Sequence, residues 1–228
     1  MHLSRLPGGP PPRYTLRHAP ALPTSPDVRI ESDQRVWSGR FPLDVIRFRN
    51  RRFDGTMSGL RTWEMWRRGR AVAMLPYDPA ADAVVLIEQF RFPAFAAGLD
   101  PVVVEFPAGL LEDGENPEET MHRELQKEMA MTADRLERIG GFLLTAGGAD
   151  EFCDLYVGRV QAPVTAPDGI AWHAGEASED EGIRVRVWPA AKAIEAALDG
   201  KFTNSITAIG LLWLAARRDG LRQRWLAS

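Results

Sequence analysis

The segment from Gly109 to Met131, GLLEDGENPEETMHRELQKEMAM, is the feature of this sequence that most restricts its fold. It consists of a turn-rich loop followed by an acidic stretch that carries the signals of a helix start. Asn116 is suited to the N-cap, Pro117 to the first helical position, and Glu119 completes an N-x-x-E cap. The sequence therefore predicts a helix that begins near Pro117.

This helix places two carboxylates side by side above an apolar stripe. With 3.6 residues per turn, Glu124 and Glu128 lie on one stripe, while Met121, Leu125 and Met129 form a neighbouring stripe that can face a core. Carboxylates at this spacing repel each other by a few tenths of a kcal/mol. A hard divalent cation such as Mg²⁺ would offset the repulsion, because it prefers carboxylate and water oxygens.

The alternative is an ordinary solvated helix without a bound ion. In that case Glu119 pairs with Arg123, and Glu124 pairs with Lys127, on the helix surface. Exposed acidic helices are common, so the spacing alone favours this alternative. The sequence around the helix is needed to distinguish a metal-binding helix from an ordinary solvated one.

Length and composition indicate a globular protein and argue against several classes of partner. The chain has 228 residues, of which 45% are hydrophobic and 26% charged, enough for one domain with an appendage or for two small domains. The net charge of −3 and the lack of a Lys/Arg-rich block argue against nucleic acid. The longest apolar run, Ile206 to Ala216, is too short to span a bilayer.

The N-terminus and the cysteine content favour a cytoplasmic protein. Prolines and glycines occupy the N-terminal stretch where a signal peptide would need its apolar segment. Cys153 is the only cysteine in the sequence, so no intramolecular disulfide can form and a reducing compartment is the simplest assumption.

Changes in composition predict four regions along the chain. Residues 1–26 form a Pro-rich arm, and residues 27–68 show the alternation of three antiparallel strands, with Asp54-Gly55 as the clearest hairpin signal. Residues 69–217 form the main domain, and residues 218–228 a C-terminal tail. The aromatic residues of the small sheet either form its own core or pack against the main domain or a second subunit; they are Trp37, Phe41, Trp63 and Trp66.

The main domain alternates strands and helices. Residues 161–181 lack periodicity and end in an acid cluster, as a mobile surface loop would. A helix is expected over 190–199, and a last helix begins at Asn204. The strands expected on either side of the acidic helix are AVAMLPY, AVVLIEQ, PVVVEF, GGFLL, FCDLYVGRV and IRVRVW. This order predicts an α/β fold with a mixed sheet between helices.

The order of residues in the acidic segment resembles the signature of the Nudix hydrolase family, G-x5-E-x7-R-E-U-x-E-E-x-G-U, where U is aliphatic. The positions that match are Gly109, Glu115, Arg123, Glu124, Leu125 and Glu128. The resemblance implies a Nudix α/β/α sandwich with a mixed sheet, to which this chain adds a small N-terminal antiparallel sheet of three strands.

Outside the signature, the chain is similar to the ADP-ribose pyrophosphatase branch of this family from about Phe41 to Leu214. The segments that carry this similarity include FPLDVIRFRNRRFDGTMS, FPAGLLEDGE, GGFLLTAGGADE, EDEGIRV and GKFTNSITAIGLLWL. The resemblance implies metal-dependent hydrolysis of the pyrophosphate bond of ADP-ribose to AMP and ribose 5-phosphate. It also implies a homodimer that forms through the N-terminal sheet.

By the same resemblance, Glu124 and Glu128 bind Mg²⁺ or Mn²⁺ with help from the backbone carbonyl of Ala108. Glu179 in the acidic loop is the expected catalytic base, and Glu181 is a further metal ligand. The neighbouring acids Glu176 and Asp180 compete for the role of base. A solvated loop without a catalytic role is the alternative for this cluster.

The substrate contacts follow from the resemblance as well. Arg91 is expected to contact phosphate, because its forked donors suit anionic oxygens. Glu64 and Arg68 match positions near the nucleoside, with a surface strand pair as the alternative. Where branch members can offer an aromatic residue and an arginine to sandwich the base, this chain has Arg40 and Trp63, in swapped order.

Two positions depart from the signature. Lys127 stands where the first carboxylate of the E-E pair is expected, and Ala130 stands where glycine is expected. Lys127 should weaken metal binding, which raises the alternative of a Nudix fold that binds a nucleotide but turns it over poorly, as a sensor. The swapped Arg40 and Trp63 raise a third possibility, hydrolysis of another nucleoside diphosphate sugar such as GDP-mannose.

Overall fold

The computed structural model describes residues 21–175 and 182–227. Within these ranges the chain separates into two compact units. The N-terminal unit comprises the residues up to Gly69 together with Thr145–Glu151, and the C-terminal unit comprises Arg70–Leu144 and the residues from Phe152 onward. The segment 145–151 thus belongs to the N-terminal unit, although the chain on both sides of it belongs to the other.

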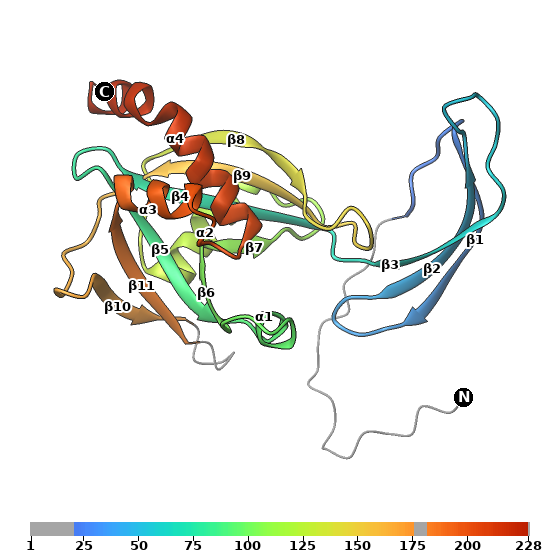
Figure 1. The fold of residues 1–228 in the computed structure, drawn as a ribbon, viewed down its shortest axis with the longest axis horizontal. Helices are drawn as coiled ribbons and strands as arrows, with labels where there is room; N and C mark the ends of the chain where they lie inside the picture. Colours follow the sequence, from blue (N-terminus) through green and yellow to red (C-terminus); the bar gives the residue numbers. More distant parts are fainter. Residues whose placement is uncertain (1–20, 176–181, 228) are drawn as a thin grey trace, which may run out of the picture. The chain divides into compact units, whose positions relative to one another are not determined.

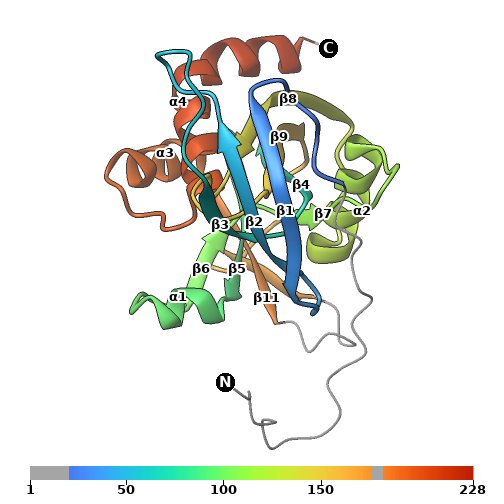
Figure 2. The same cartoon turned by 90° about the vertical axis from the view of Figure 1, so that its right-hand side faces the viewer.

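The N-terminal unit is built on the antiparallel sheet that the sequence predicted (Figure 2). Its strands in the described residues are β1 (Val28–Trp37), β2 (Leu43–Asn50) and β3 (Arg61–Trp66), in that spatial order. The predicted turn at Asp54-Gly55 lies between β2 and β3. There the Thr56 N–H donates to the Asp54 carboxylate at 2.8 Å, and Gly55 has a φ of +84°, which glycine adopts without a steric penalty.

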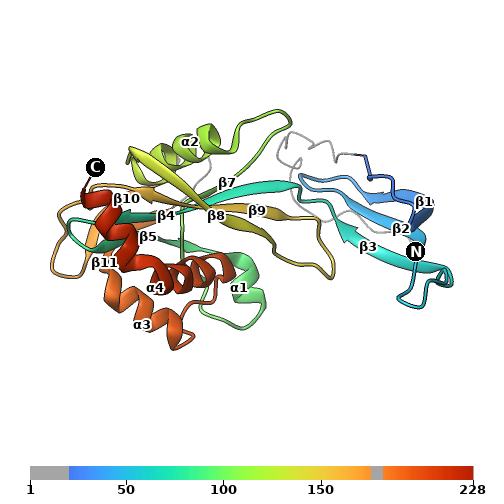
Figure 3. The ribbon, with the colours of Figure 1, turned by 90° about the horizontal axis from the view of Figure 1, so that it is seen from above.

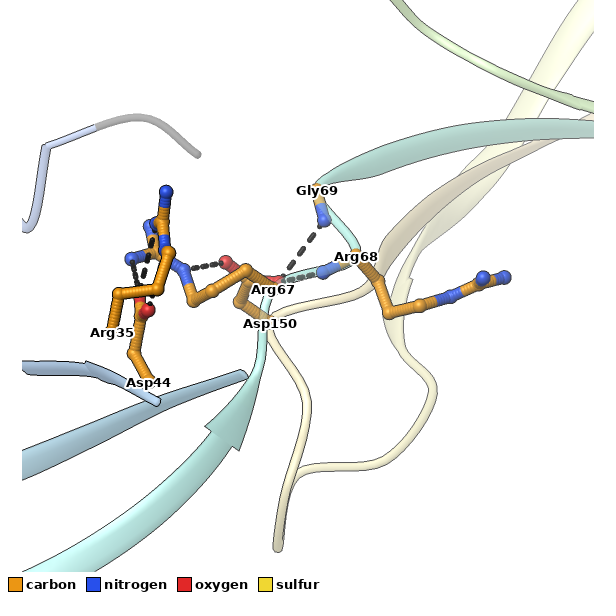
Figure 4. Close-up of polar contacts among 6 residues, drawn as sticks. All are labelled: Arg35, Asp44, Arg67, Arg68, Gly69 and Asp150. Atoms are coloured by element: carbon orange, nitrogen blue, oxygen red, sulfur yellow. Dashed lines mark hydrogen bonds and ion pairs between the residues drawn. The ribbon is translucent and has the colours of Figure 1, made fainter. Parts of the chain in front are cut away.

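A buried arginine links this sheet to the segment 145–151. The Arg67 side chain is only 4% exposed and donates to Asp44 at 3.0 Å and to Asp150 at 2.7 Å (Figure 4). The other oxygen of Asp150 accepts the backbone N–H groups of Arg68 and Gly69. Removing one partner from such a buried pair costs about 3–5 kcal/mol, because it leaves an uncompensated charge.

The C-terminal unit contains a mixed sheet with helices on both faces (Figure 1). The strand order is β10-β11-β5-β4-β9-β8, with β6 beside β5 and β7 beside β4. The pair β4 and β9 is parallel, and the other pairs are antiparallel. The strands are β4 (Arg70–Asp78), β5 (Ala83–Phe90), β6 (Val102–Glu105), β7 (Ala108–Leu110), β8 (Arg135–Leu143), β9 (Phe152–Arg159), β10 (Ile170–Ala174) and β11 (Ile183–Pro189).

The helices of this unit lie on the two faces of the sheet, with α2 on one face and α3 and α4 on the other (Figure 3). They are α1 (Phe92–Ala96), α2 (Pro117–Met129), α3 (Ala190–Leu198) and α4 (Ser205–Leu226). Along β4, Val72 and Met74 pack toward α2, whereas Ala73 and Leu75 pack toward α3 and α4. Both faces of this strand are covered, which explains its uninterrupted apolar sequence. The predicted α/β/α sandwich is confirmed.

Helix α2 begins as predicted. The Asn116 side chain accepts the backbone N–H of Glu118 at 2.9 Å, and Pro117 is the first helical residue. Met121, Leu125 and Met129 are fully buried against the sheet. Burial of each such side chain contributes about 1.5–3 kcal/mol, so this stripe fixes the face that α2 turns toward the sheet.

Helix α2 ends at Ala130 in the left-handed conformation, with φ of +50° and ψ of +35°. The family signature has glycine here. Because Ala130 is exposed, the added methyl group is not crowded by its surroundings. Alanine at this position instead destabilises the fold through its backbone. The left-handed conformation costs an L-residue about 1–2 kcal/mol of conformational free energy, a cost that glycine does not have.

We therefore expect Ala130→Gly to raise the free energy of unfolding by about 0.5–1 kcal/mol, after the greater unfolded-state entropy of glycine is subtracted. Urea unfolding measures this as a higher midpoint with an unchanged slope. Ala97→Gly is the matched control: Ala97 also caps a helix but has φ of −83°, so its replacement should lower stability. A lower midpoint for Ala130→Gly would contradict the explanation.

Two segments differ from the sequence-based expectation. Residues 161–181 were expected to lack a strand, but 170–174 form β10 and pair with β11, because Ala171 and Trp172 pack on the core beside α2. Residues 218–228 were expected to be a tail, yet α4 continues to Leu226. Leu221 and Trp225 are buried one turn apart, which binds this part of the helix to the core.

The described part of the chain has no helix that combines the length and the apolar composition needed to span a bilayer.

Candidate functional site

The two predicted metal-binding carboxylates are buried where α2 lies against β7. Glu124 is 8% exposed and Glu128 is 7% exposed, so neither is the solvated surface residue that the alternative required. One oxygen of Glu128 accepts the backbone N–H of Ala108 at 3.1 Å. The sequence predicted a role for the carbonyl of Ala108, and the hydrogen bond seen here is made by its N–H. This bond fixes the side chain of Glu128 against β7.

Gly109 lets Glu124 lie against the same strand. A Cβ atom at Gly109 would fall 2.3 Å from Cγ and 2.5 Å from Cδ of Glu124. Such distances are far inside van der Waals contact, so any other residue at this position would displace the carboxylate. The signature glycine is therefore required for the close approach of α2 and β7. Ala108 and Gly109 are consecutive residues of β7. Ala108 contacts the carboxylate of Glu128, and Gly109 lies against that of Glu124.

The loop before α2 is held by an ion pair that the signature also contains. Arg123 donates to Glu115 at 2.5 Å and lies 3.4 Å from an oxygen of Glu124. The hydrogen bond from Arg123 is the main reason that the pKa of Glu115 falls from 4.5 to about 2. The stabilisation from this pair is present above pH 4.5 and is lost as the pH falls toward 2. Arg123 thus orients the carboxylate of Glu115 and also contacts that of Glu124.

The donor set fits a hard divalent cation in part. The described residues supply two buried carboxylates one turn apart, and they contain no cluster of three or more His, Cys, Asp or Glu side chains that could hold a metal ion. Mg²⁺ is commonly held by one or two carboxylates, with water and substrate phosphate completing its shell. Two oxygen ligands on a rigid helix are therefore sufficient for a site that is completed by substrate.

Arg91 lies at the end of β5 and is joined to this region through Glu105. Its guanidinium donates to the buried Glu105 carboxylate, with Nε at 2.8 Å and Nη2 at 2.7 Å. Glu105 ends β6 and stands three residues before Ala108. One short stretch, from Glu105 to Gly109, therefore holds both Arg91, the predicted phosphate contact, and the two carboxylates of α2.

The two residues predicted near the nucleoside both lie in the N-terminal unit. Glu64 is exposed on β3. The Arg68 guanidinium lies over the rings of Phe41, at 4.0 Å, and Trp66, at 4.7 Å, and it donates to Glu151 at 2.9 Å. Figure 4 shows its side chain directed away from the Arg67 contacts. Arg68 is thus held by two aromatic rings and a carboxylate.

The structure does not bring Arg40 and Trp63 together within the N-terminal unit. Arg40 lies over Phe41 at 5.6 Å, whereas Trp63 lies beside Arg61 and lines an apolar hollow on one face of the sheet. Trp63 also donates its indole N–H to the carbonyl of Gly147 at 3.0 Å. A base sandwiched by this pair of residues from one chain is therefore not supported.

The acids of the predicted mobile loop lie outside the described residues. They are Glu176, Glu179, Asp180 and Glu181.

The model of the NUDIX domain matches residues 67–205 of this chain. The chain belongs to the Nudix family. The match spans the whole of α2, both departures from the signature and the acidic loop that lies outside the described residues. The buried Glu124 and Glu128 are therefore the signature carboxylates of a Nudix domain.

Similar proteins extend the likeness beyond the Nudix signature. The ADP-ribose pyrophosphatase of Escherichia coli (strain K12) is 37% identical over 199 residues, which cover 87% of this chain and 93% of that protein. A GDP-mannose pyrophosphatase of Cronobacter sakazakii is 28% identical over 192 residues, covering 84% and 96%. The crystal structure of an ADP compounds hydrolase has a TM-score of 0.60 at 19% identity, covering 86% and 98%, and shows the same fold.

Sequence analysis missed Glu105 and Asn204. Asn204 was identified only as the start of a helix, yet its side chain donates to Glu105 at 2.8 Å across 99 residues of sequence. The available signal was the single charged residue that interrupts the apolar strand PVVVEF.

Proposed function

We propose that this protein is a metal-dependent enzyme that hydrolyses the pyrophosphate bond of ADP-ribose to AMP and ribose 5-phosphate. The observation that carries the proposal is the burial of Glu124 and Glu128 against consecutive residues of β7 in a Nudix domain. The likeness to an ADP-ribose pyrophosphatase over 87% of the chain supports the substrate.

In this proposal Glu124 and Glu128 hold a divalent cation, Mg²⁺ or Mn²⁺, together with the Ala108 carbonyl and Glu181. When bound, the cation would neutralise the negative charge of the diphosphate and polarise its oxygens. The surrounding residues hold the two carboxylates before substrate arrives: Ala108 fixes Glu128 through a hydrogen bond, and Gly109 leaves the space that Glu124 fills. Carboxylates that are held in place before the cation arrives lose little conformational freedom when they bind it.

Arg91 binds an anionic oxygen of the pyrophosphate, and Glu179 accepts the proton of the attacking water. A carboxylate with a pKa of about 4 is ionised at neutral pH and can accept that proton. The oxygen of the water forms a bond to phosphorus while the bridging P–O bond breaks, which yields AMP and ribose 5-phosphate. Glu64 and Arg68 contribute to binding at the nucleoside end.

A panel of nucleoside diphosphate sugars, assayed with Mg²⁺ and with Mn²⁺, tests this proposal. We expect ADP-ribose to give the highest kcat/KM, with AMP and ribose 5-phosphate as equimolar products and no turnover in excess chelator. A higher kcat/KM for GDP-mannose would favour the second candidate. The likeness to a GDP-mannose pyrophosphatase at 28% identity supports that candidate less strongly.

A substitution at Lys127 distinguishes an active enzyme from a weakly active sensor. Its side chain is exposed in the last turn of α2, beside Glu128. We expect Lys127→Glu to lower the Mg²⁺ concentration needed for half-maximal activity several-fold, because it reverses a charge near the carboxylates. The maximal rate of AMP release should change less than about threefold, since Glu124 and Glu128 are retained.

Lys192→Glu is the matched control for this prediction. It makes the same change of charge on exposed α3, and should leave both the Mg²⁺ requirement and the rate unaltered. A gain of a hundredfold or more in the maximal rate of Lys127→Glu would instead favour the sensor.

We also propose a homodimer through the N-terminal sheet. One face of that sheet carries an apolar hollow of about 400 Å³, lined in part by Ile30, Ile46, Phe48, Trp63 and Met65. A second copy of the same face would cover these side chains. Sedimentation equilibrium should then give twice the chain mass of 25.4 kDa.

A cytoplasmic location fits the single, buried Cys153.

A further inference from the structure

Glu105 is a buried carboxylate whose two oxygens join different parts of the C-terminal unit. It is 8% exposed. One oxygen, Oε2, accepts Nε–H of Arg91 at 2.8 Å and lies 2.7 Å from Nη2 of the same residue, and the other, Oε1, accepts the side-chain amide of Asn204 at 2.8 Å. Arg91 follows β5 and lies 14 residues before Glu105, whereas Asn204 precedes α4 and lies 99 residues after it, so neither contact arises from neighbours in the chain.

Asn204 is itself held in one orientation. Its Oδ1 accepts the backbone N–H of Thr207 at 3.0 Å and the Thr207 hydroxyl at 3.2 Å, as the N-cap of α4. Thr207 is completely buried. Because Oδ1 is engaged by the helix, the amide group of Asn204 is left to donate to Glu105. The start of α4 therefore fixes the direction of the Glu105 carboxylate.

Arg91 is held at its backbone as well as at its guanidinium. Its backbone N–H donates to the carbonyl of Pro101 at 2.7 Å, and its side chain is 42% exposed. Within the described part of the chain, Glu105 is the only acceptor that its guanidinium contacts. An arginine has five N–H donors, so those not directed at Glu105 remain for a second anion.

The same stretch of chain reaches the α2 carboxylates. Glu105 is followed by Phe106 and Pro107 and then by Ala108, whose N–H holds Glu128. A single segment thus sets the position of the arginine and of the carboxylate pair. A pyrophosphate that spans a cation and a guanidinium requires such a fixed separation between them.

We propose that Glu105 is a positioning residue, which orients the guanidinium of Arg91 toward an anionic oxygen of the pyrophosphate and is itself oriented by Asn204. This inference rests on the proposed function and adds to it the origin of the phosphate-binding geometry. A prepositioned arginine loses less conformational freedom on binding than a free one, so substrate binds more tightly.

The test measures the dissociation constant of ADP-ribose by calorimetry without divalent cation, so that no hydrolysis occurs. We expect Glu105→Gln to weaken binding about tenfold, since an amide cannot accept from both Arg91 and Asn204 with the strength of a carboxylate. With Mg²⁺ present, KM should rise by a similar factor while kcat changes less than about threefold.

A double-mutant cycle separates positioning from a purely structural role. In the Arg91→Ala background, Glu105→Gln should cause no further loss of ADP-ribose affinity, because Glu105 acts through Arg91. Asn204→Ser keeps a helix-capping side chain but removes the amide donor, and should weaken binding about threefold with Arg91 present and not at all without it.

Glu137→Gln is the matched structural control. Glu137 on β8 also joins a strand to α4, accepting Trp225 Nε1–H at 2.6 Å and Arg224 at 2.9 Å. Its replacement should lower stability without altering ADP-ribose affinity. Unchanged affinity in Glu105→Gln, or equal losses with and without Arg91, would overturn the inference alone. Failure of the wild-type protein to bind ADP-ribose would overturn the proposed function as well.

Discussion

Glu128→Gln is expected to reduce the rate of ADP-ribose hydrolysis by about a thousandfold or more while the protein remains folded. The loss corresponds to about 4 kcal/mol of transition-state stabilisation, within the range of a lost metal contribution. The fold should persist because glutamine has nearly the same shape and its carbonyl can still accept the Ala108 N–H, which is 3.1 Å from Glu128.

The measurement is kcat/KM with saturating Mg²⁺, together with a thermal unfolding curve for each variant. Glu119→Gln is the matched control, since Glu119 lies on the exposed first turn of the same helix and has no role in the site. It should retain at least half of the wild-type rate. A Glu128→Gln variant with more than a tenth of the wild-type rate would remove Glu128 from the centre of the site.

Gly109→Ala should have the second largest effect, and it changes no charged group. Its Cβ would lie 2.3 Å from Cγ of Glu124, so either the carboxylate or the strand must move. Overpacking of this kind costs about 1–3 kcal/mol of stability, and a displaced ligand costs activity as well. We expect kcat to fall about a hundredfold at temperatures where the variant is still folded.

Gly220→Ala provides the control for added volume at a glycine. The nearest atom to its new Cβ would be 3.8 Å away, on Arg224, and the residue lies within α4. This variant should gain about 1 kcal/mol of stability from helix propensity and keep full activity. A Gly109→Ala variant that keeps wild-type kcat would show that Glu124 need not lie against β7.

The parts of the site that sequence analysis predicted are those encoded locally. The cap at Asn116 and the buried stripe of α2 follow from spacing within one helix, and both appear as expected. The family signature identified Glu124 and Glu128 because it fixes residue types over one continuous segment. Short-range patterns of this kind require no knowledge of the rest of the fold.

Contacts between distant segments could not be predicted in the same way. The hydrogen bond between Asn204 and Glu105 joins residues far apart in sequence, and neither residue type reveals its partner. The left-handed cap at Ala130 was missed because alanine is a strong helix former. The extension of α4 depends on burial of Leu221 and Trp225 among arginines, which made the segment resemble a polar tail.

The proposed role of Glu124 and Glu128 is to hold the divalent cation of the reaction jointly. Its most direct test is a titration of Mn²⁺ into the wild-type protein and the Glu124→Gln/Glu128→Gln variant, with free Mn²⁺ measured by electron paramagnetic resonance. We expect at least one bound Mn²⁺ per wild-type chain and at least a tenfold loss of Mn²⁺ affinity in the folded variant. Equal Mn²⁺ binding by the two proteins would contradict it.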